Sequence, residues 1–144
     1  MPRTISTTDE TLAELRRLTK EGGGVLNPAA VVESARSKDS PLHDRFTWDD
    51  TEAAHQYRLE EARRLIRVHV EIIGQDAAPS PVWVSLASDQ AAGGGYRPLV
   101  NVLSHAEQRA ELLSQAKDDM RRFAAKYRML SELADVVAAM RKAM

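Results

Sequence analysis

The chain has 144 residues, of which 43% are hydrophobic and 28% charged, and its formal net charge is −1. This composition favours one compact domain with a packed core, and it argues against a disordered chain and against a strongly basic nucleic-acid binder. Cysteine is absent, which excludes disulfides and thiolate metal sites. The sequence holds neither an apolar run of ~20 residues, as a membrane span requires, nor an apolar signal core at the N-terminus. We therefore expect a cytoplasmic protein that makes no membrane contact.

The first predicted helix covers residues 7–20. It is expected to begin at Thr7, because Thr7 and Glu10 have the spacing of a capping box. Leucines then recur at helical spacing and predict one apolar face. Three glycines at 22–24 end the helix, because glycine readily adopts the left-handed conformation that closes helices.

A second, short helix is predicted to begin with Asn27 as its N-cap and Pro28 in its first turn. In the segment after it, Pro41, Phe46 and Trp48 are expected to hold the second and third helices together. Caps and aromatic anchors explain these residues without any ligand.

The third predicted helix covers about residues 50–73, with Asp49 as its cap and Gly74 as its end. Its apolar side chains recur at helical spacing, and His69 lies among them as an expected core residue. Residues 1–74 therefore form a predicted N-terminal helical region.

Residues 75–103 are predicted to be a linker and a β-hairpin. The alternating residues 82–86 indicate one strand, and residues 87–95 read as a flexible loop. The following residues, up to 102, indicate a second strand, with Pro98 near its start placing it at an edge.

Residues 104–144 are predicted to form a long C-terminal helix, at about 105–142, with Ser104 and Glu107 as a capping box. At ~1.5 Å per residue this helix exceeds roughly 50 Å, which is more than a small domain covers, so we expect a homo-oligomer, with intertwined chains as one form of it. The alternative is that the third helix folds back along it. The expected oligomer interface consists of Leu113, Met120, Phe123, Tyr127, Leu130 and Val137.

The sequence offers little for catalysis. Neither glycine triplet, at 22–24 or 93–95, has the strand before it and the Lys-Ser/Thr after it that a phosphate-binding loop needs. The four histidines lack the spacing of metal ligands, and no nucleophile motif is present. We predict no catalytic residue, no metal site and no cofactor, and therefore a protein that is not an enzyme.

Nucleic-acid binding has the best support. The first two helices with their glycine turn have the outline of a helix-turn-helix, although Glu33 lies on the expected reading face. Basic residues of the third helix extend the candidate surface, and the alternative there is a solvated, ion-paired face. The candidate residues are Arg16, Arg17, Lys20, Asn27, Arg36, Lys38, Arg63 and Arg67.

Residues 26–66 resemble small uncharacterised proteins encoded by bacteriophages and prophages. The resemblance continues in "VSLASD", "GGGYRPLVNVL" and "KYRMLSELADV", and so covers nearly the whole chain. It implies a phage or prophage origin and a bacterial cytoplasm, and it assigns no activity. The residues that carry it in the first stretch are Leu26, Pro28, Val31, Val32, Ala35, Arg36, Ser40, Pro41, Leu42, His43, Phe46, Trp48, Asp49, Asp50, Ala53, Ala54, Arg58, Ala62, Arg63, Leu65 and Ile66.

The fold we expect is mainly α with a small β-hairpin, with a helix-turn-helix-like three-helix N-terminal region and a long C-terminal helix. The expected function is that of a non-enzymatic phage or prophage accessory protein, which binds DNA or a DNA-bound partner through its N-terminal helices. The alternative is an oligomeric interaction protein, an inhibitor or assembly factor, that binds a host or phage protein and no nucleic acid.

Overall fold

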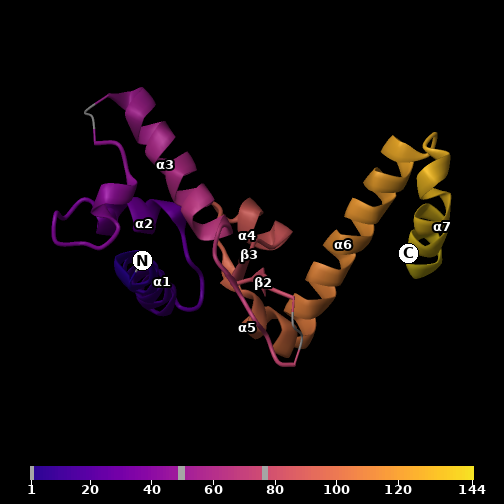
Figure 1. Ribbon diagram of the computed structural model, residues 1–144, viewed down its shortest axis with the longest axis horizontal. Coiled ribbons are helices and arrows are strands. Elements are labelled where there is room, and N and C mark those ends of the chain that lie inside the picture. The colour runs from indigo at the N-terminus through magenta and orange to yellow at the C-terminus, as the bar shows by residue number, and fades with distance from the viewer. Residues whose placement is uncertain (1, 49–50, 76–77) are drawn as a thin grey trace. The chain divides into compact units, whose positions relative to one another are not determined.

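The computed structural model describes residues 2–48, 51–75 and 78–144, and of residues 2–8 it describes the backbone alone. The chain divides into two compact units, Met1–Asn101 and Val102–Met144. The fold is mainly α-helical with two very small antiparallel strand pairs, as the sequence predicts (Figure 1). The helices of the first unit are α1 (Pro2–Glu21), α2 (Pro28–Ala35), η1 (His43–Arg45), α3 (Glu52–Arg67) and α4 (Ala87–Ala91), with α5 (Leu99–Ser104) at the boundary.

Helix α1 begins at Pro2, so the predicted start at Thr7 is wrong. Thr7 lies inside the helix, where its backbone amide has a partner within the helix, so the Thr7–Glu10 capping box does not mark a helix start. The glycine turn is where the sequence places it. Gly23 and Gly24 have φ angles of 68° and 96°, which glycine adopts without strain.

Helix α2 begins as predicted. The Asn27 side chain accepts a hydrogen bond of 2.9 Å from the backbone amide of Ala29, and Pro28 occupies the first turn. An N-cap side chain accepts a hydrogen bond from the backbone amide two or three residues later in the chain. Neighbouring residues are therefore enough to predict both features.

Helix α3 is shorter than its prediction. Its N-cap is Thr51, whose hydroxyl accepts a hydrogen bond of 3.1 Å from the amide of Ala54. The predicted cap, Asp49, lies outside the described residues. The helix ends at Arg67, and the next residues form strand β1 (Val70–Glu71), so a helix up to residue 73 is wrong.

The predicted hairpin is present as a much smaller structure. Strand β2 (Ser80–Pro81) pairs with β1, and strand β3 (Trp83–Val84) pairs with β4 (Arg97–Pro98), both antiparallel. Two predictions are wrong here: residues 87–91 form α4 instead of a loop, and residues 99–104 form α5 instead of a strand.

The core of the first unit lies among α1, α2, α3 and the β3–β4 pair. The segment between α2 and α3 contributes Leu42 and Phe46 to it, and Trp48 packs against it, which confirms the expected anchoring role of these aromatic residues. The buried core residues are Leu15, Leu18, Leu26, Val31, Val32, Ala35, Leu42, Phe46, Ala62, Ile66, Val82, Trp83 and Tyr96.

The second unit is a helical hairpin. A long helix is present, as expected, but it is α6 (Ala106–Tyr127), which ends well before residue 142. The chain then turns through η2 (Ser131–Leu133) into α7 (Ala134–Ala143), which packs back against α6 (Figure 1). The predicted cap is also wrong, because the N-cap position of α6 is His105 and no side chain caps it. Within the part of the chain that the structure describes, no helix is long and apolar enough to cross a membrane.

Candidate functional site

A cleft of about 430 Å³ opens between the start of α2, one face of α3 and the glycine loop that follows α4. We call it the arginine cleft and define it by Asn27, Arg63, Arg67, Gln90 and Gly93–Gly95. Among the described residues that line it, none is acidic. Its volume is in the range of sites for small ligands.

The two arginines reach the cleft because of their spacing on α3. Arg63 and Arg67 are four residues apart and therefore share one face of the helix. The buried residues of α3, Arg58, Ala62 and Ile66, lie on a neighbouring face and hold the helix on the core.

Glu60 is the carboxylate nearest to both cleft arginines. Its Oε1 atom lies 2.8 Å from Nη1 of Arg63, and its Oε2 atom lies 4.0 Å from Nη2 of Arg67. One carboxylate therefore faces two guanidinium groups, and this group of three carries a formal charge of about +1. All three side chains are about half exposed, so the ion pairs themselves add little stability.

The glycine loop adds three residues without side chains to the lining of the cleft. Gly93, Gly94 and Gly95 have φ angles of 112°, 90° and 149°, and residues with a side chain rarely adopt such angles. A Cβ atom on Gly95 would lie 2.5 Å from Cγ1 of Val25, so close approach also requires glycine there. Apart from the adjacent residues, no described atom lies within 4 Å of where a Cβ on Gly93 or Gly94 would stand, so the space beside these two glycines is open.

A backbone bridge holds the glycine loop next to α2. The amide of Leu26 donates to the Tyr96 carbonyl at 2.6 Å, and the amide of Tyr96 donates back to Leu26 at 2.8 Å. No pattern in the sequence indicates this pairing, because the two residues are far apart in the chain and form one isolated bridge.

An ion pair between Asp89 and Arg97 also stabilises the glycine loop. The Arg97 guanidinium donates two hydrogen bonds, of 2.7 and 2.9 Å, to the carboxylate of Asp89 on α4. The backbone carbonyl of Asp89 also accepts a bond of 2.9 Å from the amide of Gly94. Asp89 is 8% exposed, which makes this the most enclosed ion pair of the described residues. Neither residue was a predicted site residue.

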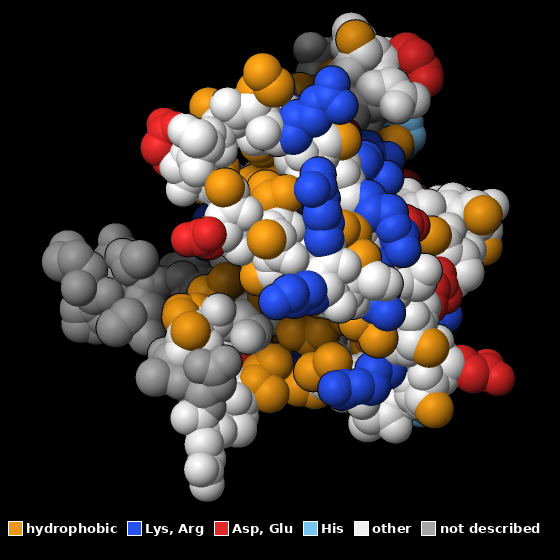
Figure 2. Space-filling view, turned by 90° about the vertical axis from the view of Figure 1, so that its right-hand side faces the viewer, with side chains coloured by type: hydrophobic (Ala, Val, Ile, Leu, Met, Phe, Trp, Pro, Cys, Tyr) orange, Lys and Arg blue, Asp and Glu red, His pale blue; other side chains and the backbone are white. Residues whose placement is uncertain are grey.

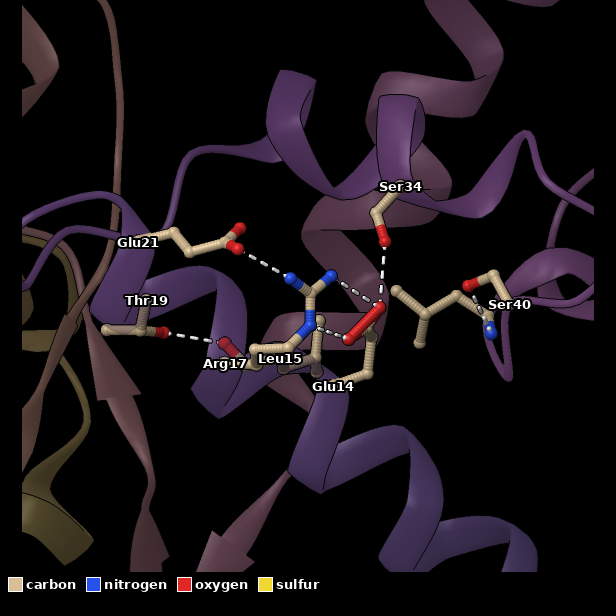
Figure 3. A network of polar contacts seen from close by, with 8 residues as sticks. Glu14, Leu15, Arg17, Thr19, Glu21, Ser34 and Ser40 are labelled. Carbon is tan, nitrogen blue, oxygen red and sulfur yellow. Dashed lines mark hydrogen bonds and ion pairs between the residues drawn. The ribbon is translucent and has the colours of Figure 1, made fainter.

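Arg17, a predicted nucleic-acid contact, is engaged in a polar network between α1 and α2. Figure 3 shows its guanidinium between Glu14 and Glu21, while the Ser34 hydroxyl donates to Glu14 at 2.9 Å. Hydrogen bonding from Arg17 holds the pKa of Glu14 below its usual value, with the Ser34 bond acting the same way against the effect of burial. The same contact with Glu14 raises the pKa of Arg17.

Two other candidates line a different hollow, which we call the Trp83 cleft. Arg16 and Lys20 of α1 stand at its rim, and its floor includes Trp83. Arg16 forms an ion pair of 2.8 Å with Glu71 of β1. The volume is about 380 Å³, and the lining is more apolar than that of the arginine cleft.

The expected reading helix, α2, presents few polar groups. Half of its residues are buried, namely Pro28, Val31, Val32 and Ala35. Its outward residues are two alanines and Glu33, which pairs with Arg36 at 2.9 Å. Lys38 lies exposed in the turn after the helix. The structure therefore brings Asn27, Arg63 and Arg67 together, and it leaves Arg36 and Lys38 outside that cleft.

The predicted interface residues of the second unit fall into two groups. Val137 is buried within the hairpin, and the rings of Phe123 and Tyr127 contact each other at 4.8 Å, beside a half-buried Met120. Leu113 and Leu130 are exposed. Figure 2 shows hydrophobic side chains exposed among lysine and arginine side chains on the face in view.

Two of the four histidines, His43 and His69, take structural positions in the first unit. His43 stacks on the Trp48 ring at 5.1 Å, and the buried His69 meets the edge of Trp83 at 5.9 Å. Among the described residues, no three or more His, Asp or Glu side chains gather as metal ligands would. No protein-family model, curated protein or solved structure matches this chain, so its own geometry carries the functional argument.

Proposed function

We propose that the protein is a non-enzymatic accessory protein, of phage or prophage type, that binds nucleic acid through its N-terminal unit. The observation that carries this proposal is the arginine cleft, which is lined by two guanidinium groups with one shared carboxylate and by a loop of three glycines. Guanidinium groups bind phosphate oxygens with two parallel hydrogen bonds, and such contacts supply most non-specific affinity for nucleic acids.

The cleft replaces α2 as the proposed contact surface. A reading helix needs outward side chains that reach base edges, whereas the outward face of α2 offers Ala29, Ala30 and Glu33. Arg17 and Arg36 do not line the cleft, and the carboxylates that they contact are not shared between two arginines. The proposed binding therefore depends on phosphate contacts and reads no base sequence through α2.

The variant Arg63→Gln/Arg67→Gln tests the proposal. We expect it to lower the affinity for short single-stranded and duplex DNA at low salt by about tenfold, because it removes two phosphate contacts. Fluorescence anisotropy with a labelled oligonucleotide measures the affinity.

Arg64→Gln is the matched control. Arg64 is the neighbour of Arg63 on the same helix, but it lies over the Tyr57 ring at 5.8 Å and does not line the cleft. This variant should keep most of the affinity. A wild-type protein that binds no DNA at low salt, or an equal loss in both variants, contradicts the proposal.

A second candidate function is self-association through the C-terminal unit, as a protein-interaction factor. The observation that favours it is a set of exposed apolar side chains, in which Met129 is 87% and Leu113 54% exposed, and Leu130 and Val136 are nearly half exposed. Exposed apolar groups of this kind gain free energy when a partner covers them.

Light scattering tests the second candidate. The wild type should form a dimer or larger assembly, and Leu113→Ser/Leu130→Ser should be monomeric. Val70→Ser is the control, because Val70 is also exposed but belongs to the first unit. A monomeric wild type at high protein concentration contradicts self-association.

A further inference from the structure

The shape of the arginine cleft limits which phosphate groups can enter it. The lining of the cleft includes the two arginines of α3 and the glycine loop, which the Leu26–Tyr96 bridge holds next to α2. The volume of about 430 Å³ suits a small group, whereas a duplex presents its phosphates along a wide convex surface.

The lining favours a compact and highly charged group. Arg63 and Arg67 supply the charge, which Glu60 neutralises in part, and no described lining residue is acidic. Gln90 adds a side-chain amide to the lining, and its nitrogen contacts the hydroxyl of Ser85. The open space beside Gly93 and Gly94 lets a ligand approach the backbone, because no side chain of the loop fills it.

A phosphate monoester meets these conditions better than an internal phosphodiester. It carries a charge of about −1.5 to −2 near neutral pH, with three terminal oxygens, whereas a phosphodiester carries −1. A monoester also has a sugar on one side alone, so it can enter the cleft end-on. An internal phosphodiester would bring a sugar on each side into the cleft.

Resting on the proposed function, we infer that the arginine cleft takes a phosphate monoester. The source of this group is the terminal phosphate of a nucleic-acid strand or a free nucleotide. Arg63 and Arg67 hold its oxygens, and the open space beside Gly93 and Gly94 leaves room for the group. No covalent step is involved.

The first arm of the test compares two short single strands that differ at one end. Both carry a 3′ label, and one has a 5′ phosphate where the other has a 5′ hydroxyl. At low salt the wild type and Arg64→Gln should bind the phosphorylated strand about tenfold more tightly, and Arg63→Gln/Arg67→Gln should lose this preference. Because both arginines are about half exposed, the double variant should keep its thermal midpoint, which circular dichroism checks.

The second arm uses calorimetry with adenosine 5′-monophosphate and with adenosine. Binding of the monophosphate alone, lost in the double variant and kept in Arg64→Gln, supports the monoester site. If the monophosphate binds in this way and the protein binds the phosphorylated and the unphosphorylated strand equally well, the site takes free nucleotides. If the monophosphate binds and neither strand does, the proposed nucleic-acid function fails while the monoester site stands.

One combined result overturns the inference and leaves the proposed function intact. In that result the wild type has no preference for the phosphorylated strand and no affinity for the monophosphate, yet the double variant still binds DNA more weakly than Arg64→Gln. The cleft arginines then contact internal phosphates. If neither strand nor monophosphate binds at all, both the inference and the proposed function are wrong.

Discussion

At the scale of single residues, the corner around Trp48 illustrates how polar side chains serve the fold. His43 stacks on one side of the indole, and the guanidinium of Arg58 lies 5.1 Å from its centre. The indole N–H of Trp48 donates a hydrogen bond of 2.9 Å to the His43 carbonyl. The Arg58 side chain, which is 4% exposed, donates to the Thr47 carbonyl. Such cation–π and hydrogen-bond contacts explain why a conspicuous cluster of aromatic and basic residues needs no ligand.

Glu14 makes stability depend on pH at the same scale. Its folded-state pKa lies below the usual value of 4.5, with Arg17 as the main cause. A lowered folded-state pKa adds stability above pH ~4.5, and this contribution is lost as the pH falls through the folded-state pKa. We predict that Glu14→Gln destabilises the protein by about 1 kcal/mol at neutral pH, a modest value because Arg17 is half exposed.

Urea unfolding of the wild type and the Glu14→Gln variant between neutral and acidic pH measures this effect. The difference in the free energy of unfolding should shrink as the pH falls below about 4.5. Glu10→Gln, at an exposed position one turn earlier on α1, is the control and should change little. A difference for Glu14→Gln that stays constant with pH would show that the carboxylate charge has no part in it.

At the scale of elements, the features that depend on neighbouring residues could be predicted from the sequence. The features that depend on distant residues could not. The Asn27–Pro28 start of α2 was predictable because cap and amide are neighbours in the chain. The end of α6 at Tyr127 was not, since residues 128–131 contain neither glycine nor proline and the apolar pattern continues across them. Each strand is only two residues long. An alternation of apolar and polar residues, which identifies strands in a sequence, cannot be recognised over so short a segment.

Part of the candidate site could likewise be predicted from the sequence, and part of it could not. The common face of Arg63 and Arg67 follows from their spacing on a helix, which the sequence alone indicates. Their place in one cleft with Gly93–Gly95 depends on the Leu26–Tyr96 bridge, which no local pattern encodes. For the same reason the second glycine triplet was interpreted as a flexible turn, although it forms a wall of the cleft.

The Asp89–Arg97 pair gives a prediction at this scale. Replacing Asp89 with asparagine leaves the Arg97 guanidinium largely enclosed without its carboxylate, so we expect a loss of about 2 kcal/mol in the free energy of unfolding. Urea unfolding followed by tryptophan fluorescence measures it, because both tryptophans belong to the first unit. The control Glu33→Gln breaks the exposed pair with Arg36 and should cost less than about 0.5 kcal/mol. Equal effects of the two variants would contradict the structural role assigned to Asp89.

At the scale of the whole molecule, the division into two units changes one expectation. The oligomer was inferred from a single helix of about 105–142, whereas the structure has α6 and α7 packed as a hairpin. The helix-length argument therefore no longer holds, and self-association now rests on the exposed apolar residues of the second unit.

Charge also limits binding at this scale. The net charge of −1 provides no general attraction for nucleic acid, so binding has to come from the local positive charge of the arginine cleft. Few phosphates are then contacted, and the affinity should depend on salt less steeply than that of a strongly basic protein.

The salt dependence of single-stranded DNA binding tests the central claim most directly. Each phosphate contact contributes a slope of about −0.7 to the log–log plot of affinity against salt concentration. If Arg63 and Arg67 each contact one phosphate charge, the slope should become less negative by about 1.4 in Arg63→Gln/Arg67→Gln and stay at the wild-type value in Arg64→Gln. A slope that is the same in all three proteins would contradict phosphate binding in the arginine cleft.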